Sequence, residues 1–114
     1  MRVLVTGATG LIGAAVMARL VEAGHETVGV ARDVGRAARR LPAVRWLSLD
    51  IAAATAPEAW LPHLAGVDAV VNCAGALQGG PRDSLRGVHR EGVHALFTAC
   101  ERAGVRRVVH FSAM

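Results

Sequence analysis

The feature that most constrains the fold of this chain is the run TGATGLIG at residues 6–13, whose glycines are spaced G-x-x-G-x-x-G. The run follows Arg2–Thr6, which predicts a buried strand, and precedes a segment with apolar residues at helical spacing. Gly7 permits a sharp turn, Gly10 lets the backbone approach a diphosphate, and Gly13 lets the helix pack tightly on the sheet. The free N–H groups and positive dipole end of that helix then face the phosphates. The run therefore predicts a dinucleotide-binding loop.

The rest of the chain alternates between predicted strands and predicted helices. This rhythm requires parallel strands, right-handed crossovers and helices on both faces of the sheet. We therefore predict one α/β domain over residues 1–114, a doubly wound parallel Rossmann sheet with five strands in the order 3-2-1-4-5. The predicted strands are Arg2–Thr6, Glu26–Ala31, Val44–Leu49, Asp68–Asn72 and Val105–Phe111, and the predicted helices are Leu11–Ala23, a short helix capped by Asp33 and ended by Pro42, Pro57–Leu64 and Asp83–Ala103.

Lysine and tyrosine are both absent, since all 13 basic residues are arginine and the tyrosine count is 0. Any mechanism that needs a phenol or an amine side chain from these residues is excluded. The arginines behind the net charge of +4 are scattered and not interleaved with aromatic residues. The composition therefore predicts no nucleic-acid partner.

Cysteine and histidine spacings exclude two further kinds of site. Cys73 and Cys100 lie far apart without a C-x-x-C pattern, and His89 and His94 fall on different faces of the predicted helix. The sequence therefore predicts neither a disulfide framework nor a metal site. It also has no apolar run as long as a membrane span, so we expect a protein of the reducing cytoplasm.

Five segments together resemble one enzyme superfamily. They are TGATGLIG at 6–13, GHETVGVARD at 24–33, the corner Leu49–Ile51, VVNCAG at 70–75 and EGVHALFTACERAGVRRVVHFSAM at 91–114. In this order they resemble the extended and atypical branches of the short-chain dehydrogenase/reductase superfamily. The resemblance covers the whole chain but only the N-terminal half of the usual length, which implies a domain truncated before its substrate-binding part.

The resemblance implies an NADP(H)-binding domain of an oxidoreductase, epimerase or dehydratase that acts on a small molecule. The ending VVHFSAM also resembles the NmrA-like redox sensors and the accessory subunit of respiratory complex I. A non-catalytic nucleotide-binding sensor or accessory protein is therefore the alternative. A homo-oligomer is left open.

The resemblance assigns cofactor contacts to three loops. In the third-strand corner the Asp50 carboxylate would accept from adenine and Ile51 would lie on its ring, although Asp50 equally suits a turn cap. In the loop beneath the ribose, Cys73 is expected to be a small buried residue and not a nucleophile. The expected cofactor-binding residues of these loops are Gly7, Ala8, Thr9, Gly10, Leu11, Ile12, Gly13, Asp50, Ile51, Cys73, Ala74 and Gly75.

The end of the second predicted strand favours NADP over NAD. An acid at this place would bind the ribose 2′-OH, but the chain has Ala31 there, followed by Arg32, whose guanidinium suits a 2′-phosphate. Asp33 would oppose the phosphate if it pointed inward. Arg36 could assist Arg32, although we expect the arginines of residues 36–40 to form a solvated helix face.

Catalysis in the superfamily uses a serine, a tyrosine and a lysine four residues beyond the tyrosine. Ser112 matches the serine position and is the one catalytic candidate. His89 stands where many relatives have a supporting asparagine, so we expect a surface or packing role for it. Without tyrosine and lysine, these residues alone should not be active.

Overall fold

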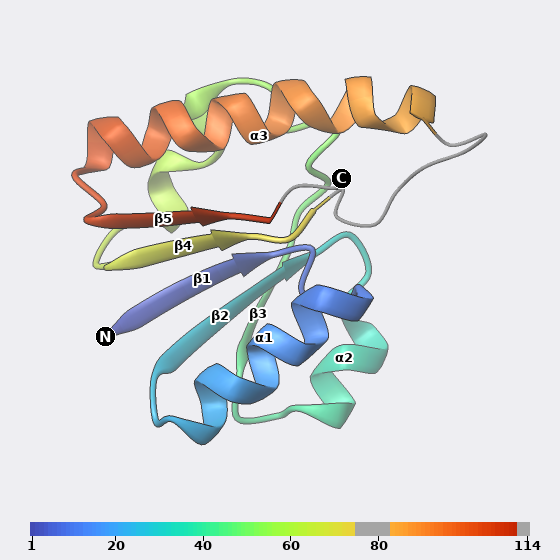
Figure 1. Ribbon diagram of the computed structural model, residues 1–114, viewed down its shortest axis with the longest axis vertical. Coiled ribbons are helices and arrows are strands. Elements are labelled where there is room, and N and C mark those ends of the chain that lie inside the picture. The colour runs from blue at the N-terminus through green and yellow to red at the C-terminus, as the bar shows by residue number, and fades with distance from the viewer. Residues whose placement is uncertain (75–82, 112–114) are drawn as a thin grey trace.

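The computed structural model describes residues 1–74 and 83–111, with the side chains of residues 83–89 left out. These form a parallel sheet with helices on both faces (Figure 1). The sheet is five-stranded in the order β3-β2-β1-β4-β5, which confirms the predicted fold and strand order. The strands are β1 (Arg2–Thr6), β2 (Glu26–Ala31), β3 (Arg45–Ser48), β4 (Ala69–Asn72) and β5 (Arg107–His110), and the helices are α1 (Leu11–Glu22), α2 (Gly35–Arg40) and α3 (Asp83–Ala103).

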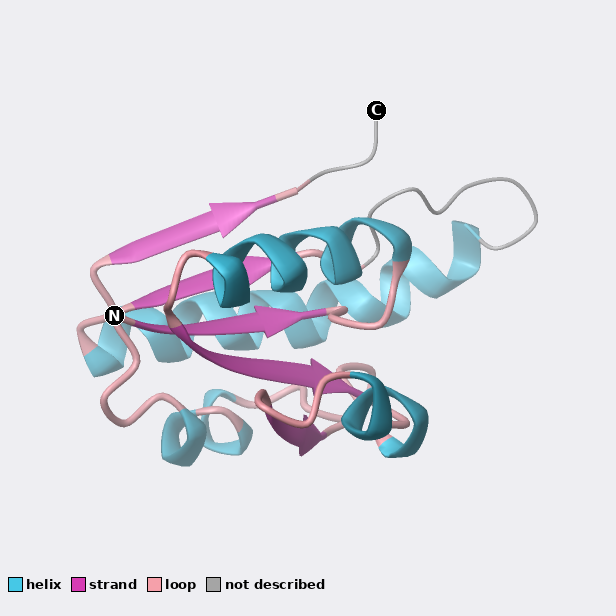
Figure 2. Cartoon of the chain, turned by 90° about the horizontal axis from the view of Figure 1, so that it is seen from below, coloured by secondary structure: helices cyan, strands magenta, loops and turns pink. Residues whose placement is uncertain are grey.

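Helices cover the sheet in two layers. Figure 2 shows α1 and α2 on one face and α3 on the other. On the α3 face, Leu4, Val70 and Leu96 are fully buried around Trp60. On the α1 face, Val5 and Met17 are fully buried in a second cluster. The central strands are thus apolar on both faces, as expected of a parallel sheet between two helical layers.

The predicted helix over Pro57–Leu64 is wrong. The structure has two 3-10 turns instead, η1 (Pro57–Ala59) and η2 (Leu61–His63). Pro62 explains the break, because a proline inside an α-helix lacks the N–H for the bond to residue i−4 and its ring clashes with that carbonyl.

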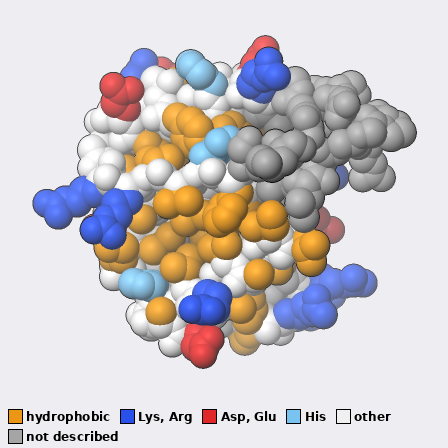
Figure 3. All heavy atoms as spheres, in the orientation of Figure 1, with side chains coloured by type: hydrophobic (Ala, Val, Ile, Leu, Met, Phe, Trp, Pro, Cys, Tyr) orange, Lys and Arg blue, Asp and Glu red, His pale blue; other side chains and the backbone are white. Residues whose placement is uncertain are grey.

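Strand β5 forms one edge of the sheet and is exposed along its length. Val109 is 48% exposed and Phe111, just after the strand, is 38% exposed. Phe111 also lines an apolar groove with Leu11, Ile12 and Val16 of α1. Figure 3 shows apolar side chains gathered over the middle of the face seen in Figure 1. In the described part of the chain, no helix is long and apolar enough to cross a membrane.

Candidate functional site

The glycine loop leaves the sheet directly after β1 and is held by main-chain contacts. Gly7 has φ of +64°, a left-handed conformation that glycine adopts without strain. The N–H of Gly10 donates to the Gly7 carbonyl at 3.1 Å, and the N–H of Ala8 donates to Val30 of β2 at 3.2 Å. A β-carbon at Gly13 would overlap the carbonyl of Gly7. A side chain therefore fits at neither position, because the backbone of Gly7 is left-handed and Gly13 packs directly on Gly7.

The loop brings the start of α1 to the carboxyl edge of the sheet. Helix α1 begins at Leu11, and its N-cap is Gly10, which has no side chain to cap the helix. The first intrahelical bond runs from Ala14 N–H to the Gly10 carbonyl at 2.8 Å. Within the described residues, the N–H groups of Leu11, Ile12 and Gly13 have no hydrogen-bond partner. An anion at this helix end would meet several aligned donors and the positive end of the helix dipole.

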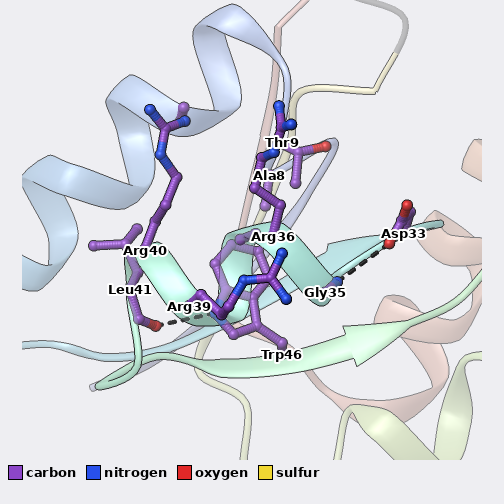
Figure 4. A pocket seen from close by; sticks show the side chains of 11 residues that line it. Ala8, Thr9, Asp33, Gly35, Arg36, Arg39, Arg40, Leu41 and Trp46 are labelled. Carbon is purple, nitrogen blue, oxygen red and sulfur yellow. Dashed lines mark hydrogen bonds between the residues drawn. The ribbon is translucent and has the colours of Figure 1, made fainter.

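A cavity of about 630 Å³ adjoins the glycine loop. Ala8 and Thr9 form one wall, and helix α2 with Trp46 forms the other. Figure 4 shows Arg36 extending from α2 toward Thr9, with Arg39 and Arg40 on the same helix. The ring N–H of Trp46 donates to the Leu41 carbonyl at 3.1 Å, which fixes the indole in this wall.

The arginines of α2 are exposed, as the sequence predicts, but they also line this cavity. Their spacing in the sequence could have indicated a shared wall, because Arg36 and Arg40 are four residues apart and lie on one helix face. Arg32 does not line the cavity, and its side chain is exposed at the end of β2. The Asp33 carboxylate accepts from the Gly35 N–H at 3.2 Å, so it caps the turn before α2.

Asp50 and Ile51 follow β3 and have different surroundings. Asp50 is exposed, and its carboxylate accepts from the Ala52 N–H at 3.0 Å, which is the turn cap that the sequence left open. Ile51 is only 9% exposed and packs in the core under α3. A β-carbon on Gly92 would overlap the Ile51 carbonyl, so this glycine lets the helix rest on the turn. The adenine contacts of both residues stay a prediction.

The turn after β4 lies against the glycine loop. A β-carbon at Gly7 would lie 2.7 Å from the backbone nitrogen of Ala74. Cys73 is buried, and desolvation raises the pKa of its thiol, which suits a small packed residue better than a nucleophile. Gly75 and Ser112 lie outside the described residues, as does the His89 side chain. No group of three potential metal ligands occurs among the residues that the structure describes.

Comparison with known proteins decides the family. A model of the NAD-dependent epimerase/dehydratase family matches residues 3–114. The chain belongs to this family. The resemblance to extended and atypical short-chain dehydrogenases is thereby confirmed. A nicotinamide dinucleotide is the cofactor that family membership supports, and the cradle at Gly7 and Gly13 fits the diphosphate of such a molecule.

Three similar proteins illustrate the range of the family. The photosystem II assembly factor Ycf39 of Synechocystis is 32% identical over an alignment of 117 positions, which covers 100% of this chain and 34% of that protein. The divinyl chlorophyllide a 8-vinyl-reductase of Oryza sativa is 36% identical over an alignment of 121 positions, which covers 98% of this chain and 30% of that protein. A short-chain dehydrogenase/reductase superfamily structure from Agrobacterium tumefaciens with bound NAD is 28% identical, with a TM-score of 0.75 over 96% of this chain and 32% of that one.

The chain spans only part of the length of its relatives. The first curated relatives that match it over nearly its whole length are covered over 12% to 34% of theirs. The substrate and activity of a whole family member are therefore matters of proposal for this chain.

Proposed function

We propose that this chain binds NADP(H) and serves as the cofactor domain of an oxidoreductase, epimerase or dehydratase of a small molecule. The observation that carries the proposal is an open helix N-terminus beside a cavity walled by arginines. When bound, the cofactor would supply hydride transfer at its nicotinamide ring. The residues of this chain would bind and orient it.

The diphosphate would lie on the glycine loop. The free N–H groups of Leu11, Ile12 and Gly13 would donate to its oxygens. Gly10 is exposed and places no side chain between the backbone and the ligand. Thr9, also exposed, would flank the diphosphate from the loop. Ala8 is buried and would only support the loop.

The ribose 2′-phosphate would lie between the end of β2 and α2. Ala31 leaves no carboxylate for a 2′-OH, while Arg32 and Arg36 can provide paired guanidinium donors. The Asp33 carboxylate already accepts from Gly35, which limits its repulsion of a phosphate. These features support NADP over NAD.

The adenosine and nicotinamide ends would contact the two remaining loops. The exposed carboxylate of Asp50 would accept from the adenine amine, with Ile51 supporting the turn from the core. Cys73, Ala74 and Gly75 would pass beneath the ribose, and Ser112 would hold the substrate carbonyl.

A non-catalytic nucleotide-binding sensor or accessory protein is the second candidate. The similarity to an assembly factor favours it. The gene sequence beyond codon 114 discriminates the two. A Tyr-x-x-x-Lys motif there supports an enzyme, and its absence supports the sensor.

Calorimetric titration with NADPH and NADH tests the proposal. We expect both nucleotides to bind, with NADPH about tenfold tighter, because one charge-assisted phosphate contact contributes roughly 1.5 kcal/mol or more. If neither nucleotide binds at millimolar concentration, the proposed function is wrong. If the two bind equally, only the NADP preference is wrong.

A further inference from the structure

Three polar side chains connect the carboxyl ends of β1, β4 and β5. The hydroxyl of Thr6 donates to Oδ1 of Asn72, with an oxygen separation of 2.5 Å. Nδ2 of Asn72 lies 2.9 Å from Nδ1 of His110. Thr6 and Asn72 are fully buried, whereas His110 is exposed on the edge strand. The chain of bonds therefore begins in the core and ends at the surface.

The pairing of atoms along this hydrogen-bond chain determines which of them donate. The carbonyl oxygen of Asn72 accepts from Thr6, so its amide nitrogen is the atom that faces His110. The amide nitrogen can only donate, so Nδ1 of His110 must accept. The imidazole is therefore neutral with its proton on Nε2, because a protonated ring donates from both nitrogens.

This hydrogen-bond chain connects the residues that immediately precede two loops of the site, the glycine loop and the turn after β4. Thr6 immediately precedes Gly7, and Asn72 immediately precedes Cys73. The loops touch, since a β-carbon on Gly7 would meet the backbone nitrogen of Ala74. A shift of the end of β4 would therefore displace the turn that supports the glycine loop.

We propose that His110 is a positioning residue whose neutral imidazole holds Asn72, and through it the two loops, in the arrangement that binds the dinucleotide. Loss of the acceptor leaves a buried amide donor unpaired. The free protein relieves this by local rearrangement, which binding must then reverse, so the cost falls on affinity. The inference rests on the proposed function, and it makes affinity depend on the protonation of His110.

The surroundings of the ring define the control variant. Phe97 of α3 meets the His110 ring edge-on, with ring centroids 5.5 Å apart. On the helix face that carries Phe97, the titratable and charged side chains are Arg90, His94 and Glu101. Asn72 of β4 is uncharged, and Arg107 stands on β5 itself. His94 is exposed and adds a second imidazole, so His94→Asn is the matched control.

The test compares NADP⁺ affinity at about pH 8 and about pH 5.5, on either side of the range in which histidines titrate. The variant His110→Asn keeps an acceptor near the position of Nδ1 but does not titrate. His110→Leu removes the acceptor. The ligand 2′-phosphate also titrates in this range, so each variant is compared with the wild-type chain and not read alone.

We expect the wild-type chain and His94→Asn to lose roughly tenfold more affinity on acidification than His110→Asn. We expect His110→Leu to bind roughly tenfold more weakly than the wild-type chain at pH 8, and about as weakly as the wild-type chain at pH 5.5, where both lack the acceptor. The inference is overturned if His110→Asn keeps the wild-type pH profile, or if His110→Leu binds like the wild-type chain at pH 8.

A second measurement needs no ligand. The ¹⁵N chemical shifts of the imidazole should show the Nε2–H tautomer at about pH 8. An Nδ1–H tautomer would overturn the inference. If the wild-type chain binds neither NADP⁺ nor NAD⁺, the proposed function fails, while the tautomer still reports on the hydrogen-bond chain.

Discussion

The carbonyl group of Gly7 occupies the space that a β-carbon at position 13 would need. This contact fixes the start of α1 against the turn that leaves β1, so the donors of the helix and the loop form one surface. The dihedral freedom of Gly7, with φ of +64°, makes the turn possible.

The variant Gly13→Ala should therefore damage both stability and nucleotide binding. The added methyl group forces backbone apart, which we expect to lower the free energy of unfolding by roughly 1–3 kcal/mol. Chemical denaturation and calorimetric titration would measure the two effects. Gly35→Ala is the control, because its β-carbon would be 3.6 Å from Asp33, an ordinary contact. Equal stability of the two variants would contradict the prediction.

The variants Arg32→Ala and Arg36→Ala should lower the affinity for NADP more than the affinity for NAD. Each removes a guanidinium proposed to bind the 2′-phosphate, so we expect roughly tenfold weaker binding of NADP and little change for NAD. Arg106→Ala, in the exposed turn before β5, is the matched control for lost positive charge. Equal losses for both nucleotides would rule out a contact with the 2′-phosphate.

The ion pair between Arg2 and Glu26 should make stability depend on acid pH. The two side chains meet at 2.9 Å, and the hydrogen bond from Arg2 lowers the pKa of Glu26 below its ordinary value of 4.5. Because the pKa of Glu26 is lower in the folded state, its ionised carboxylate stabilises the folded protein above pH 4.5. This contribution is lost as the pH falls through the pKa of the folded state.

Urea denaturation between pH 7 and about pH 2.5 would measure this effect. The variant Glu26→Gln should show a shallower loss of stability below pH 4.5 than the wild-type chain. Glu22→Gln, at the exposed end of α1, is the control. A wild-type slope in Glu26→Gln would show that the pair contributes nothing.

The buried thiols should resist alkylation while the protein is folded. Burial raises the pKa of Cys100 to about 11, and that of Cys73 also rises. The reactive thiolate is therefore scarce at pH 8, and we expect reaction with iodoacetamide only after unfolding in urea. Mass spectrometry would count the labels. Rapid labelling of native protein would contradict the burial of these residues.

The raised thiol pKa also has a consequence for stability at alkaline pH. In the unfolded chain a thiol ionises near its ordinary pKa of 9.0, whereas folded Cys100 keeps its proton to about 11. The unfolded state thus releases protons first, and the free energy of unfolding should fall as pH rises above 9. Cys100→Ala should lessen this fall while removing a core contact.

Much of the fold follows from short-range patterns. The valine-rich run Arg2–Thr6, the helical spacing after Gly10 and the alternation along the chain predict the observed sheet order. The segment Pro57–Leu64 did not form the predicted helix, because Pro62 interrupts it and two 3-10 turns form instead. Such patterns depend on a few neighbouring residues and not on the segments that pack against them in the folded protein.

Only part of the candidate site can be predicted from such local sequence patterns. The TGATGLIG run predicts the loop because its glycine spacing expresses a backbone requirement. The cavity wall formed by Arg36 depends on how α2 packs beside Thr9, and a solvated helix has the same sequence pattern. From the sequence alone, Gly92 is expected only to destabilise its helix. The structure shows that this glycine lets α3 pack on the backbone of Ile51.

The sequence alone determined the order of strands and helices, the glycine loop and the absence of lysine and tyrosine. Only the tertiary structure decided that α2 borders the loop and that His110 meets Asn72. The physical reason is separation along the chain. Thr6 and Asn72 are 66 positions apart, and Asn72 and His110 are 38 apart, so packing of the whole sheet brings them together.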